Sequence, residues 1–239
     1  MHGIGVDQLL KKKFKYLKLG AEFNGIMGDY PAGIQGLVYG ESSQGKSSFC
    51  MQLAKSFCMN DYKVGWWSYE QGHSATMQRA LSLNNMQEVS GLFIPINPFA
   101  KMSEEVPGEA EGDHYCRDLC TAIEKRNSPQ IGFIDSGDYT EFTKANYKKA
   151  KRVCERKNRN LIWIAHGEGK VIENTVMRKI GFDGEFTIFV KDYVAYPVKS
   201  RLGGSEPYII YPEKVKEINE LNPKAYNAKV KAMISKLPN

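Results

Sequence analysis

The sequence lacks any apolar run long enough to cross a membrane, and its first residues lack the apolar centre of a signal peptide. It has five cysteines, an odd number, which fits a reducing cytosol better than a disulfide framework. It also shows no internal repeat and no linker that divides two domains. These absences argue against a membrane-spanning protein, a disulfide-rich secreted module and a repeat array, and we expect a cytoplasmic protein without a membrane partner.

The composition is that of a globular protein with a small excess of positive charge. Apolar residues make up 42% of the 239 residues and charged residues 25%, so the chain has enough apolar side chains to bury a core. The formal net charge of +6 permits a polyanionic partner but does not identify one. The first 27 residues are basic, with aromatic residues between the lysines.

Apolar runs alternate with amphipathic stretches over most of the chain. The runs predict buried strands over residues 34–39, 63–70, 92–96, 131–135 and 161–166. Apolar residues at helical spacing predict helices over 48–57, 74–84, 114–126 and 144–157. This alternation predicts an α/β domain with a mostly parallel central sheet covered by helices on both faces.

The last third of the chain has a different pattern. Residues 185–191, 193–199 and 208–211 are rich in strand formers and separated by short turns, so we expect antiparallel strands added near the C-terminus. Residues 213–237 predict one charged helix, and the acidic residues of 103–113 predict a mobile, solvated loop. The expected organisation is a basic segment over 1–27, a core over 28–212 and a charged helix within 213–239.

His114, Cys116 and Cys120 lie close together within the helix predicted over 114–126. A metal site needs further ligands, and this spacing is not that of a zinc finger. We therefore interpret these residues as part of a helix with buried thiols.

The run from Gly40 to Ser47 matches the phosphate-binding pattern G-x-x-x-x-G-K-[ST] without a mismatch. It lies between a predicted strand and a predicted helix, as this loop requires. Its glycines let backbone N–H groups and the helix N-terminus face one anionic site. Lys46 would reach the terminal phosphates of a nucleoside triphosphate, and Ser47 would hold Mg²⁺. The residues expected to contact the nucleotide are Gly40, Glu41, Ser42, Ser43, Gln44, Gly45, Lys46, Ser47 and Ser48.

Three further polar residues lie at the ends of predicted strands, where open α/β sheets bind their ligands. Asp135 is a candidate to help hold Mg²⁺, or alternatively caps the turn that follows it. Glu70 is a candidate to polarise the water that attacks the γ-phosphate, with an exposed strand-end carboxylate as the alternative. His166 is a candidate to sense the γ-phosphate and relay its loss to the next loop, or is a structural histidine.

Lys199 and Arg201 form a pair of cations at positions i and i+2, which point to one side of an extended chain. At a subunit edge such a pair would reach the γ-phosphate held by a neighbour, as an arginine finger does. The alternative is two solvated charges that lead into the turn at residues 203–204.

Taken together, these residues resemble the RecA-type P-loop ATPase family, most closely the ATPase core of the bacterial RadA branch. The segments that carry the resemblance are residues 28–41, 69–70 with 79–83, 134–136, 164–170 and 198–203. The chain departs from that branch because it has no cysteine-rich module before the core, no protease-like domain after it, and Leu202 where the branch has an aromatic residue. A short core of this kind is similar to RecA-like recombinase ATPases of phages and mobile elements.

The resemblance implies a RecA-like fold, ATP and Mg²⁺ as cofactors, and a homo-oligomer that is a ring or a filament. It implies catalytic roles for Lys46, Glu70, His166, Lys199 and Arg201, and metal binding by Ser47 and Asp135. It further implies single-stranded DNA as the partner, in recombination or repair. Two other functions stay open, a ring translocase of the replicative-helicase type and a regulatory ATPase that binds a protein without DNA.

The charge pattern is compatible with DNA binding. Residues 144–159 carry eight lysines and arginines against one acid, Glu155, so much of the solvent face of this helix would be positive. A highly charged helix on a soluble protein is the alternative. The loop predicted over 167–181 holds Lys170, Arg178 and Lys179, and we expect it to be flexible until DNA orders it.

Overall fold

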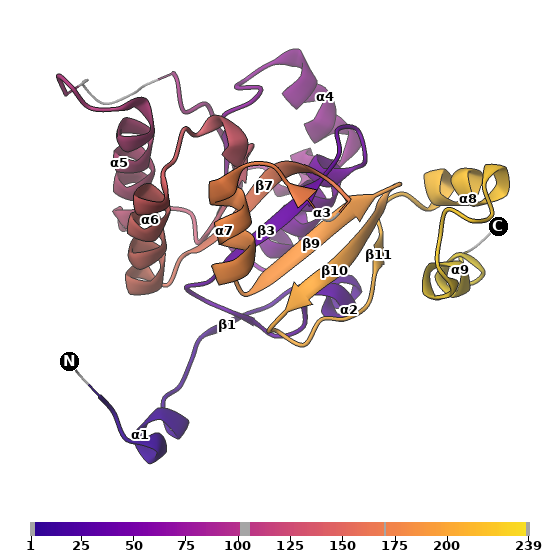
Figure 1. The fold of residues 1–239 in the computed structure, drawn as a ribbon, viewed down its shortest axis with the longest axis horizontal. Coiled ribbons are helices and arrows are strands. Elements are labelled where there is room, and N and C mark those ends of the chain that lie inside the picture. Colours follow the sequence, from indigo (N-terminus) through magenta and orange to yellow (C-terminus); the bar gives the residue numbers. More distant parts are fainter. Residues whose placement is uncertain (1–2, 101–105, 170, 238–239) are drawn as a thin grey trace.

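The computed structural model describes residues 3–100, 106–169 and 171–237. In this part of the chain, nine strands form one sheet in the order β11-β10-β9-β3-β7-β6-β4-β5, with β8 paired to the end of β7 (Figure 1). The strands are β3 (Gln35–Gly40), β4 (Val64–Ser68), β5 (Phe93–Ile96), β6 (Ile131–Asp135), β7 (Asn160–Glu168), β8 (Val171–Ile172), β9 (Phe186–Lys191), β10 (Val194–Ser200) and β11 (Tyr208–Ile209).

The centre of the sheet is parallel, and its late strands are not. Strands β3 to β7, together with β9, pair in parallel, whereas β10 and β11 continue the sheet antiparallel. All residues of β3, β4 and β6 are buried because helices cover both faces, and this explains their continuous apolar runs. The predicted α/β fold with a mostly parallel sheet and antiparallel strands near the C-terminus is therefore confirmed.

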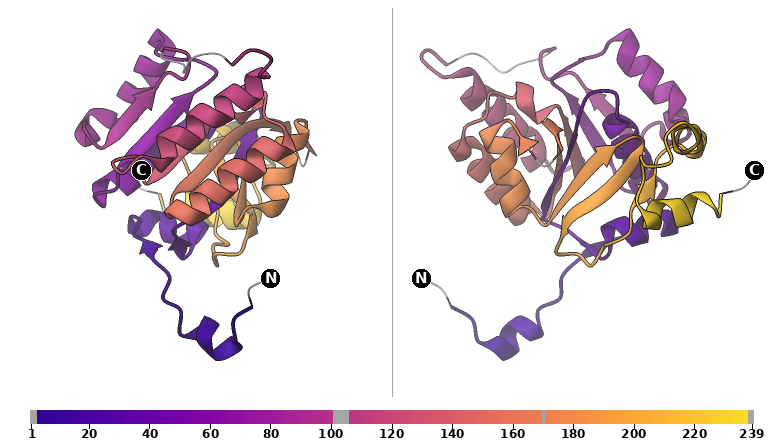
Figure 2. Two further views of the ribbon diagram at one scale, coloured as in Figure 1. Left: turned by 90° about the vertical axis from the view of Figure 1, so that its left-hand side faces the viewer. Right: turned by 45° about the vertical axis from the view of Figure 1, so that its right-hand side comes forward.

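Two helical layers enclose the sheet (Figures 1 and 2). Helices α3 (Lys46–Met59) and α4 (Ala75–Leu83) pack on one face, around Phe49, Trp66 and Phe133. Helices α5 (Glu111–Glu124), α6 (Lys144–Lys157) and α7 (Thr175–Asp183) pack on the other, around Tyr147 and Trp163. No helix within the described ranges is both long and apolar enough to cross a membrane.

The N-terminal residues reach the core only in part. Helix α1 (Val6–Leu10) projects away from the body, and none of its residues is buried (Figures 1 and 2). After it, β1 (Tyr16–Leu17) pairs with β2 (Tyr30–Pro31), and α2 (Asn24–Met27) packs into the main core.

The prediction of one C-terminal helix over 213–237 is wrong. The structure has two helices, α8 (Pro212–Leu221) and α9 (Ala228–Ile234), which pack on Val194 in a separate apolar cluster. Helix α8 ends before Asn222 because Pro223 follows, and a residue that precedes proline is disfavoured in the α conformation.

The acidic loop predicted over 103–113 is shorter than expected. Helix α5 already begins at Glu111, three residues before the predicted start, and residues 103–105 lie outside the described residues. Glu111 and Asp113 fall in the first helical turn, where carboxylates interact favourably with the helix dipole.

All five cysteines are unpaired and buried, as the reading of buried thiols requires. Cys116 and Cys120 face each other on α5 with their Sγ atoms 4.0 Å apart. Within the described residues no group of three or more histidine, cysteine, aspartate or glutamate side chains is placed to hold a metal ion.

Candidate functional site

The phosphate-loop sequence forms the turn between β3 and α3. Gly45 has a φ of 101°, a conformation that residues with a Cβ rarely adopt. At Gly40 an added Cβ would lie 2.2 Å from the carbonyl oxygen of Val190 in β9. The two glycines therefore let the loop curl and pass close to the neighbouring strand, and the N-terminus of α3 opens into the concave side of the loop.

A distant turn holds the loop in place. The side-chain carbonyl of Gln44 accepts a hydrogen bond from the backbone N–H of Asp192 at 2.6 Å. The backbone carbonyl of Gln44 accepts another from the backbone N–H of Tyr193 at 3.2 Å. Asp192 and Tyr193 form the tight turn between β9 and β10, both with positive φ. The Gln44 side chain thus braces the loop and is not free to contact a ligand.

Lys46 is buried at the first position of α3. Its ammonium donates hydrogen bonds to the carbonyl oxygens of Gly40 at 2.8 Å and Glu41 at 2.6 Å. Burial lowers the pKa of Lys46, and the nearby carboxylates of Glu70 and Asp135 oppose this effect. The cation is held inside the loop, where phosphate oxygens are stronger partners for it than neutral carbonyls.

Glu70, Asp135 and His166 come together at the ends of neighbouring strands. β6 lies between β4 and β7, and the backbone N–H of Glu70 donates to the carbonyl of Asp135 at 3.1 Å. Oε2 of Glu70 lies 3.8 Å from Nε2 of His166, within the range of an ion pair. The structure therefore brings together three residues that are far apart in the sequence.

The pKa values of these groups depend on one another. The pairing of Glu70 with His166 lowers the pKa of Glu70 and raises that of His166, so both favour their charged forms. Burial, followed by the charge of Glu70, raises the pKa of Asp135 to about 7. Asp135 is only 3% exposed, so its ionised form is costly without a cation beside it.

These groups fit Mg²⁺. The Ser47 hydroxyl and the Asp135 carboxylate line the same cavity, and both supply the oxygen ligands that Mg²⁺ prefers. A divalent cation would favour the ionised form of Asp135.

Asp138 is a supporting residue that the sequence analysis missed. Its Oδ2 accepts a hydrogen bond from the backbone N–H of His166 at 2.7 Å and another from the Ser136 hydroxyl at 3.0 Å. The carboxylate therefore ties the end of β6 to that of β7. Its only sequence signal is its place three residues after Asp135.

One cavity of about 760 Å³ contains most of the predicted residues. Those that line it are Ser42, Ser43, Gly45, Lys46, Ser47, Ser48, Glu70, Asp135 and His166. The lining does not include Gly40, Glu41 or Gln44. The lining residues that the sequence analysis did not assign to it are Gln71, Arg79, Leu83, Ser136, Ile164, Tyr193, Tyr211, Glu213 and Lys214.

Tyr193 and Tyr211 form an aromatic wall of this cavity. Their ring centroids are 6.0 Å apart, and the Tyr211 hydroxyl donates to the Ser48 hydroxyl at 3.0 Å. Tyr193 comes from the turn between β9 and β10, and Tyr211 directly precedes α8. Neither position follows a recognisable motif, because contacts over more than 140 residues bring both to the loop.

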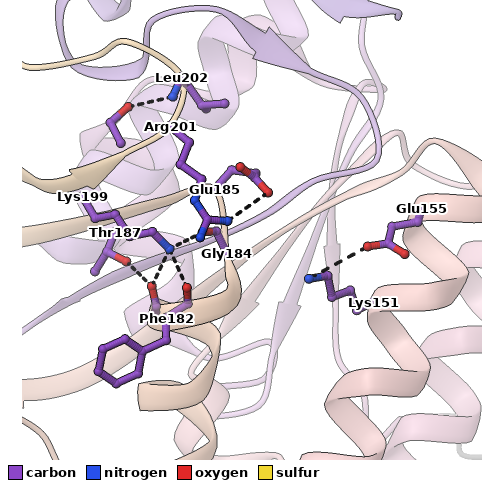
Figure 3. A network of polar contacts seen from close by, with 11 residues as sticks. Lys151, Glu155, Phe182, Gly184, Glu185, Thr187, Lys199, Arg201 and Leu202 are labelled. Carbon is purple, nitrogen blue, oxygen red and sulfur yellow. Dashed lines mark hydrogen bonds and ion pairs between the residues drawn. The ribbon is translucent and has the colours of Figure 1, made fainter. Parts of the chain in front are cut away.

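Lys199 and Arg201 lie away from this cavity, at the junction between α7 and β10 (Figure 3). The Lys199 ammonium donates to the carbonyls of Gly181 at 3.1 Å, of Phe182 at 2.7 Å and of Gly184. Arg201 Nη1 lies 3.7 Å from Glu185 Oε1, and the Arg201 side chain is 56% exposed. Within one subunit, neither cation lines the cavity that contains Lys46.

The prediction of a flexible loop over 167–181 is wrong for the described residues. β7 continues to Glu168 and pairs with β8, and α7 begins at Thr175. The Asn174 side chain caps α7, and the Arg178 guanidinium donates to the carbonyl of Ile172 at 2.8 Å. Lys170 lies outside the described residues.

No protein-family model matches the sequence, and no curated protein matches it. Among solved structures, the fold is similar to that of the flagellar accessory protein FlaH from Methanocaldococcus jannaschii. That likeness has a TM-score of 0.55 and 20% identity, and covers 82% of this chain and 97% of that one. It is also similar to the KaiC-like protein PH0186 from Pyrococcus horikoshii, with a TM-score of 0.57 and 15% identity over 79% and 90% of the two chains. At these identities the likeness shows the fold alone, which is the RecA-like α/β fold that the sequence analysis expects.

Proposed function

We propose that this chain binds Mg–ATP in the cavity of about 760 Å³ and hydrolyses it. The observation that supports this most is the convergence of Lys46, Ser47, Glu70, Asp135 and His166 around one cavity, from the ends of three strands and the start of α3. Backbone N–H groups of the loop and the Lys46 ammonium bind the phosphates. Ser47 and Asp135 hold Mg²⁺, which when bound neutralises charge on the phosphate oxygens.

Glu70 and His166 serve the hydrolytic step in this proposal. The lowered pKa keeps Glu70 ionised, so that it orients and polarises a water molecule at the γ-phosphate. His166 is paired with Glu70 at 3.8 Å and is a hydrogen-bond donor in its charged form. A γ-phosphate competes with Glu70 for this donor, and His166 thereby links the phosphate state to β8 and α7, which follow it.

We further propose single-stranded DNA as the partner and a homo-oligomer as the active form, in recombination or repair, in the cytoplasm and of phage or mobile-element type. Helix α6 supports a polyanionic partner because it carries seven lysines and arginines against one acid, Glu155. Two of these cations are in ion pairs, Lys151 with Glu155 and Arg156 with Glu124. A groove of about 350 Å³ between α5 and α6 is also lined by Lys149 and Arg152. Contacts of this kind follow phosphates without reading sequence.

A regulatory ATPase without DNA is the second candidate. It is supported by the likeness to a flagellar accessory protein and by the fact that the segment expected to be a DNA-binding loop instead contains β8 and α7. A chain of this class keeps the nucleotide cavity but shows no salt-dependent affinity for single strands.

The test is the steady-state rate of ATP hydrolysis with Mg²⁺, with and without single-stranded DNA, in the wild type and in Lys46→Ala. We expect turnover that DNA stimulates and that the variant loses. Turnover that depends on Lys46 but ignores DNA removes the DNA proposal and leaves the regulatory ATPase. Turnover that is equal in the variant contradicts the assignment of the cavity.

A further inference from the structure

Two buried polar groups near Asp135 have no hydrogen-bond partner within the described residues. They are the hydroxyl of Ser68 and the indole N–H of Trp66. Both side chains are 0% exposed, and neither lines the cavity around Lys46. A buried polar group without a partner destabilises a folded chain, so each of the two calls for an explanation.

The register of the sheet places both groups on the same face as Asp135. Ser68 lies directly opposite Asp135 in the parallel pairing of β4 and β6, and Trp66 lies two residues earlier on β4. Side chains alternate between the two faces of a sheet. Trp66 and Phe133 belong to the core under α3, whereas Trp67 belongs to the core on the other face. Ser68 and Asp135 therefore share the α3 face, side by side.

Packing fixes the indole of Trp66 beside this carboxylate. The ring stacks on Phe133 with centroids 5.3 Å apart and planes 15° from parallel, and Phe93 contacts it with a centroid distance of 6.0 Å. The Trp66 side chain opposes the rise in the pKa of Asp135, which places its N–H close to the carboxylate. The Ser68 hydroxyl needs no such packing, because it rotates to suit an acceptor.

A carboxylate that ligates a metal needs donors of this kind. Hydrogen bonds from the surrounding protein hold such a carboxylate in one orientation, and their loss typically weakens metal binding by about 10–100-fold. In the proposed function, Asp135 and Ser47 hold Mg²⁺ from inside the cavity. Because Ser68 and Trp66 do not line the cavity, they can donate to the carboxylate without competing for the metal.

We propose that Ser68 and Trp66 are positioning residues for Mg²⁺, and that both donate hydrogen bonds to the Asp135 carboxylate when the cation is bound. This inference rests on the proposed function and adds the residues that orient its metal ligand. Neither residue touches the metal or the nucleotide, so both act through Asp135. The cation favours the ionised carboxylate, which is the stronger acceptor, and this explains why both donors lack a partner among the described residues of the free chain.

The first test compares Ser68→Ala with Ser128→Ala in the full chain. Ser128 is also buried, but its hydroxyl donates to the carbonyl of Ile123 at 2.8 Å. The affinity for a slowly hydrolysed ATP analogue is measured with Mg²⁺ and again with the metal removed by EDTA. We expect Ser68→Ala to bind the metal-free analogue as the wild type does, and the Mg²⁺ complex about 10–100-fold more weakly. Ser128→Ala should match the wild type in both affinities.

The two affinities also separate this inference from the proposed function. A wild type that binds neither form of the analogue removes the proposed function itself. If the wild type binds both forms, a Ser68→Ala variant that binds the Mg²⁺ complex normally overturns only the positioning role. The same conclusion follows if Ser68→Ala weakens both affinities equally, because the effect then does not depend on the metal.

Thermal unfolding without ligand separates a positioning role from a purely structural one. Ser68→Ala removes a hydroxyl that has no partner within the described part of the chain, so we expect it to melt at the wild-type temperature or above. Ser128→Ala breaks a satisfied hydrogen bond and should melt at a lower temperature. A Ser68→Ala variant that melts below the wild type contradicts the inference, because the hydroxyl is then already bonded in the free chain.

The second test follows the Trp66 N–H directly. The chain has three tryptophans, so nuclear magnetic resonance of a nitrogen-labelled sample gives three indole N–H signals, which Trp66→Phe or assignment of the wild type identifies. We expect the Trp66 signal to move downfield when Mg²⁺ joins the complex with the analogue, because a charge-assisted hydrogen bond deshields its proton. The Trp163 N–H already donates to Gln35 at 2.9 Å and should move much less. A Trp66 signal that stays in place contradicts its role as a donor.

Discussion

The cavity around Lys46 and the junction between α7 and β10 both hold partly or fully buried charge, and they differ in what that charge faces. In the cavity, Asp135 is buried beside a second carboxylate, Glu70, and its pKa rises to about 7. At the junction, Lys199 faces three carbonyls at the end of a helix, where a cation is favourable. The cavity is thus arranged for ligands at a cost to stability, whereas the junction stabilises the free chain.

The largest expected effect is on catalysis and concerns Glu70. We expect Glu70→Gln to lower the rate of ATP hydrolysis by roughly 10²–10⁴-fold, because the amide is a much weaker base toward water. ATP affinity should remain within a few-fold of the wild type, since Glu70 does not belong to the phosphate loop. Single-turnover hydrolysis and equilibrium ATP binding, measured separately, give the two quantities. A variant that hydrolyses ATP normally removes Glu70 from the reaction.

The next effect is on stability and tests whether the buried carboxylate of Asp135 destabilises the free chain. The pKa of Asp135 is raised from its ordinary value of 3.8 to about 7, so the free chain loses stability as pH rises between these values. Asp135→Asn cannot ionise, and we expect the variant without nucleotide or Mg²⁺ to be more stable than the wild type at pH 8, by up to about 4 kcal/mol.

The same two proteins should be nearly equal in stability at pH 4, because both then carry a neutral side chain at position 135. Urea unfolding at the two pH values checks this dependence. A wild type that is the more stable protein at pH 8 would show that Asp135 is satisfied within the free chain, and would contradict the contrast with the junction.

The third effect tests the junction. Lys199→Met removes the donor to three carbonyls and should lower the free energy of unfolding by about 1–3 kcal/mol. Arg201→Gln is the matched control two residues away, and it should change stability by less than about 0.5 kcal/mol, because its ion pair is exposed. Equal losses of stability in the two variants would mean that the hydrogen bonds of Lys199 to the C-terminal end of α7 do not stabilise the chain.

The smallest effect concerns the turn that braces the phosphate loop. The Tyr226 hydroxyl donates to the carbonyl of Asp192 at 2.8 Å, and Asp192 in turn donates to Gln44. Tyr226→Phe should cost about 1 kcal/mol of stability. The residues of the turn should also exchange their amide hydrogens faster than in the wild type. Unchanged exchange at Asp192 and Tyr193 would show that Tyr226, in the segment between α8 and α9, does not support the loop.

The same two regions show what the sequence predicts and what it does not. The phosphate loop needs eight consecutive residues between a strand and a helix, so its pattern already contains its geometry. Asp135, Glu70 and His166 were also predictable as neighbours, because parallel strands present their carboxyl ends at one edge. The ion pair between Glu70 and His166, and the role of each residue, could not be predicted, because both depend on distances across the sheet.

The junction depends on contacts between distant parts of the chain. Lys199 bonds to carbonyls that lie 15 to 18 residues earlier, and main-chain acceptors leave no trace in the amino-acid pattern. The aromatic wall of the cavity could not be predicted for the same reason, since Tyr193 and Tyr211 reach it only through the packing of β9, β10 and α8. The split of the C-terminal helix was different, because Pro223 signals the break within the sequence itself.

The central claim, that the cavity around Lys46 binds Mg–ATP, is tested most directly by equilibrium titration of the full chain with ATP in the presence of Mg²⁺. The account predicts saturable binding to the wild type, and binding at least about 100-fold weaker to a folded Lys46→Ala variant. Equal affinity in the two proteins, or no binding to the wild type, would contradict it.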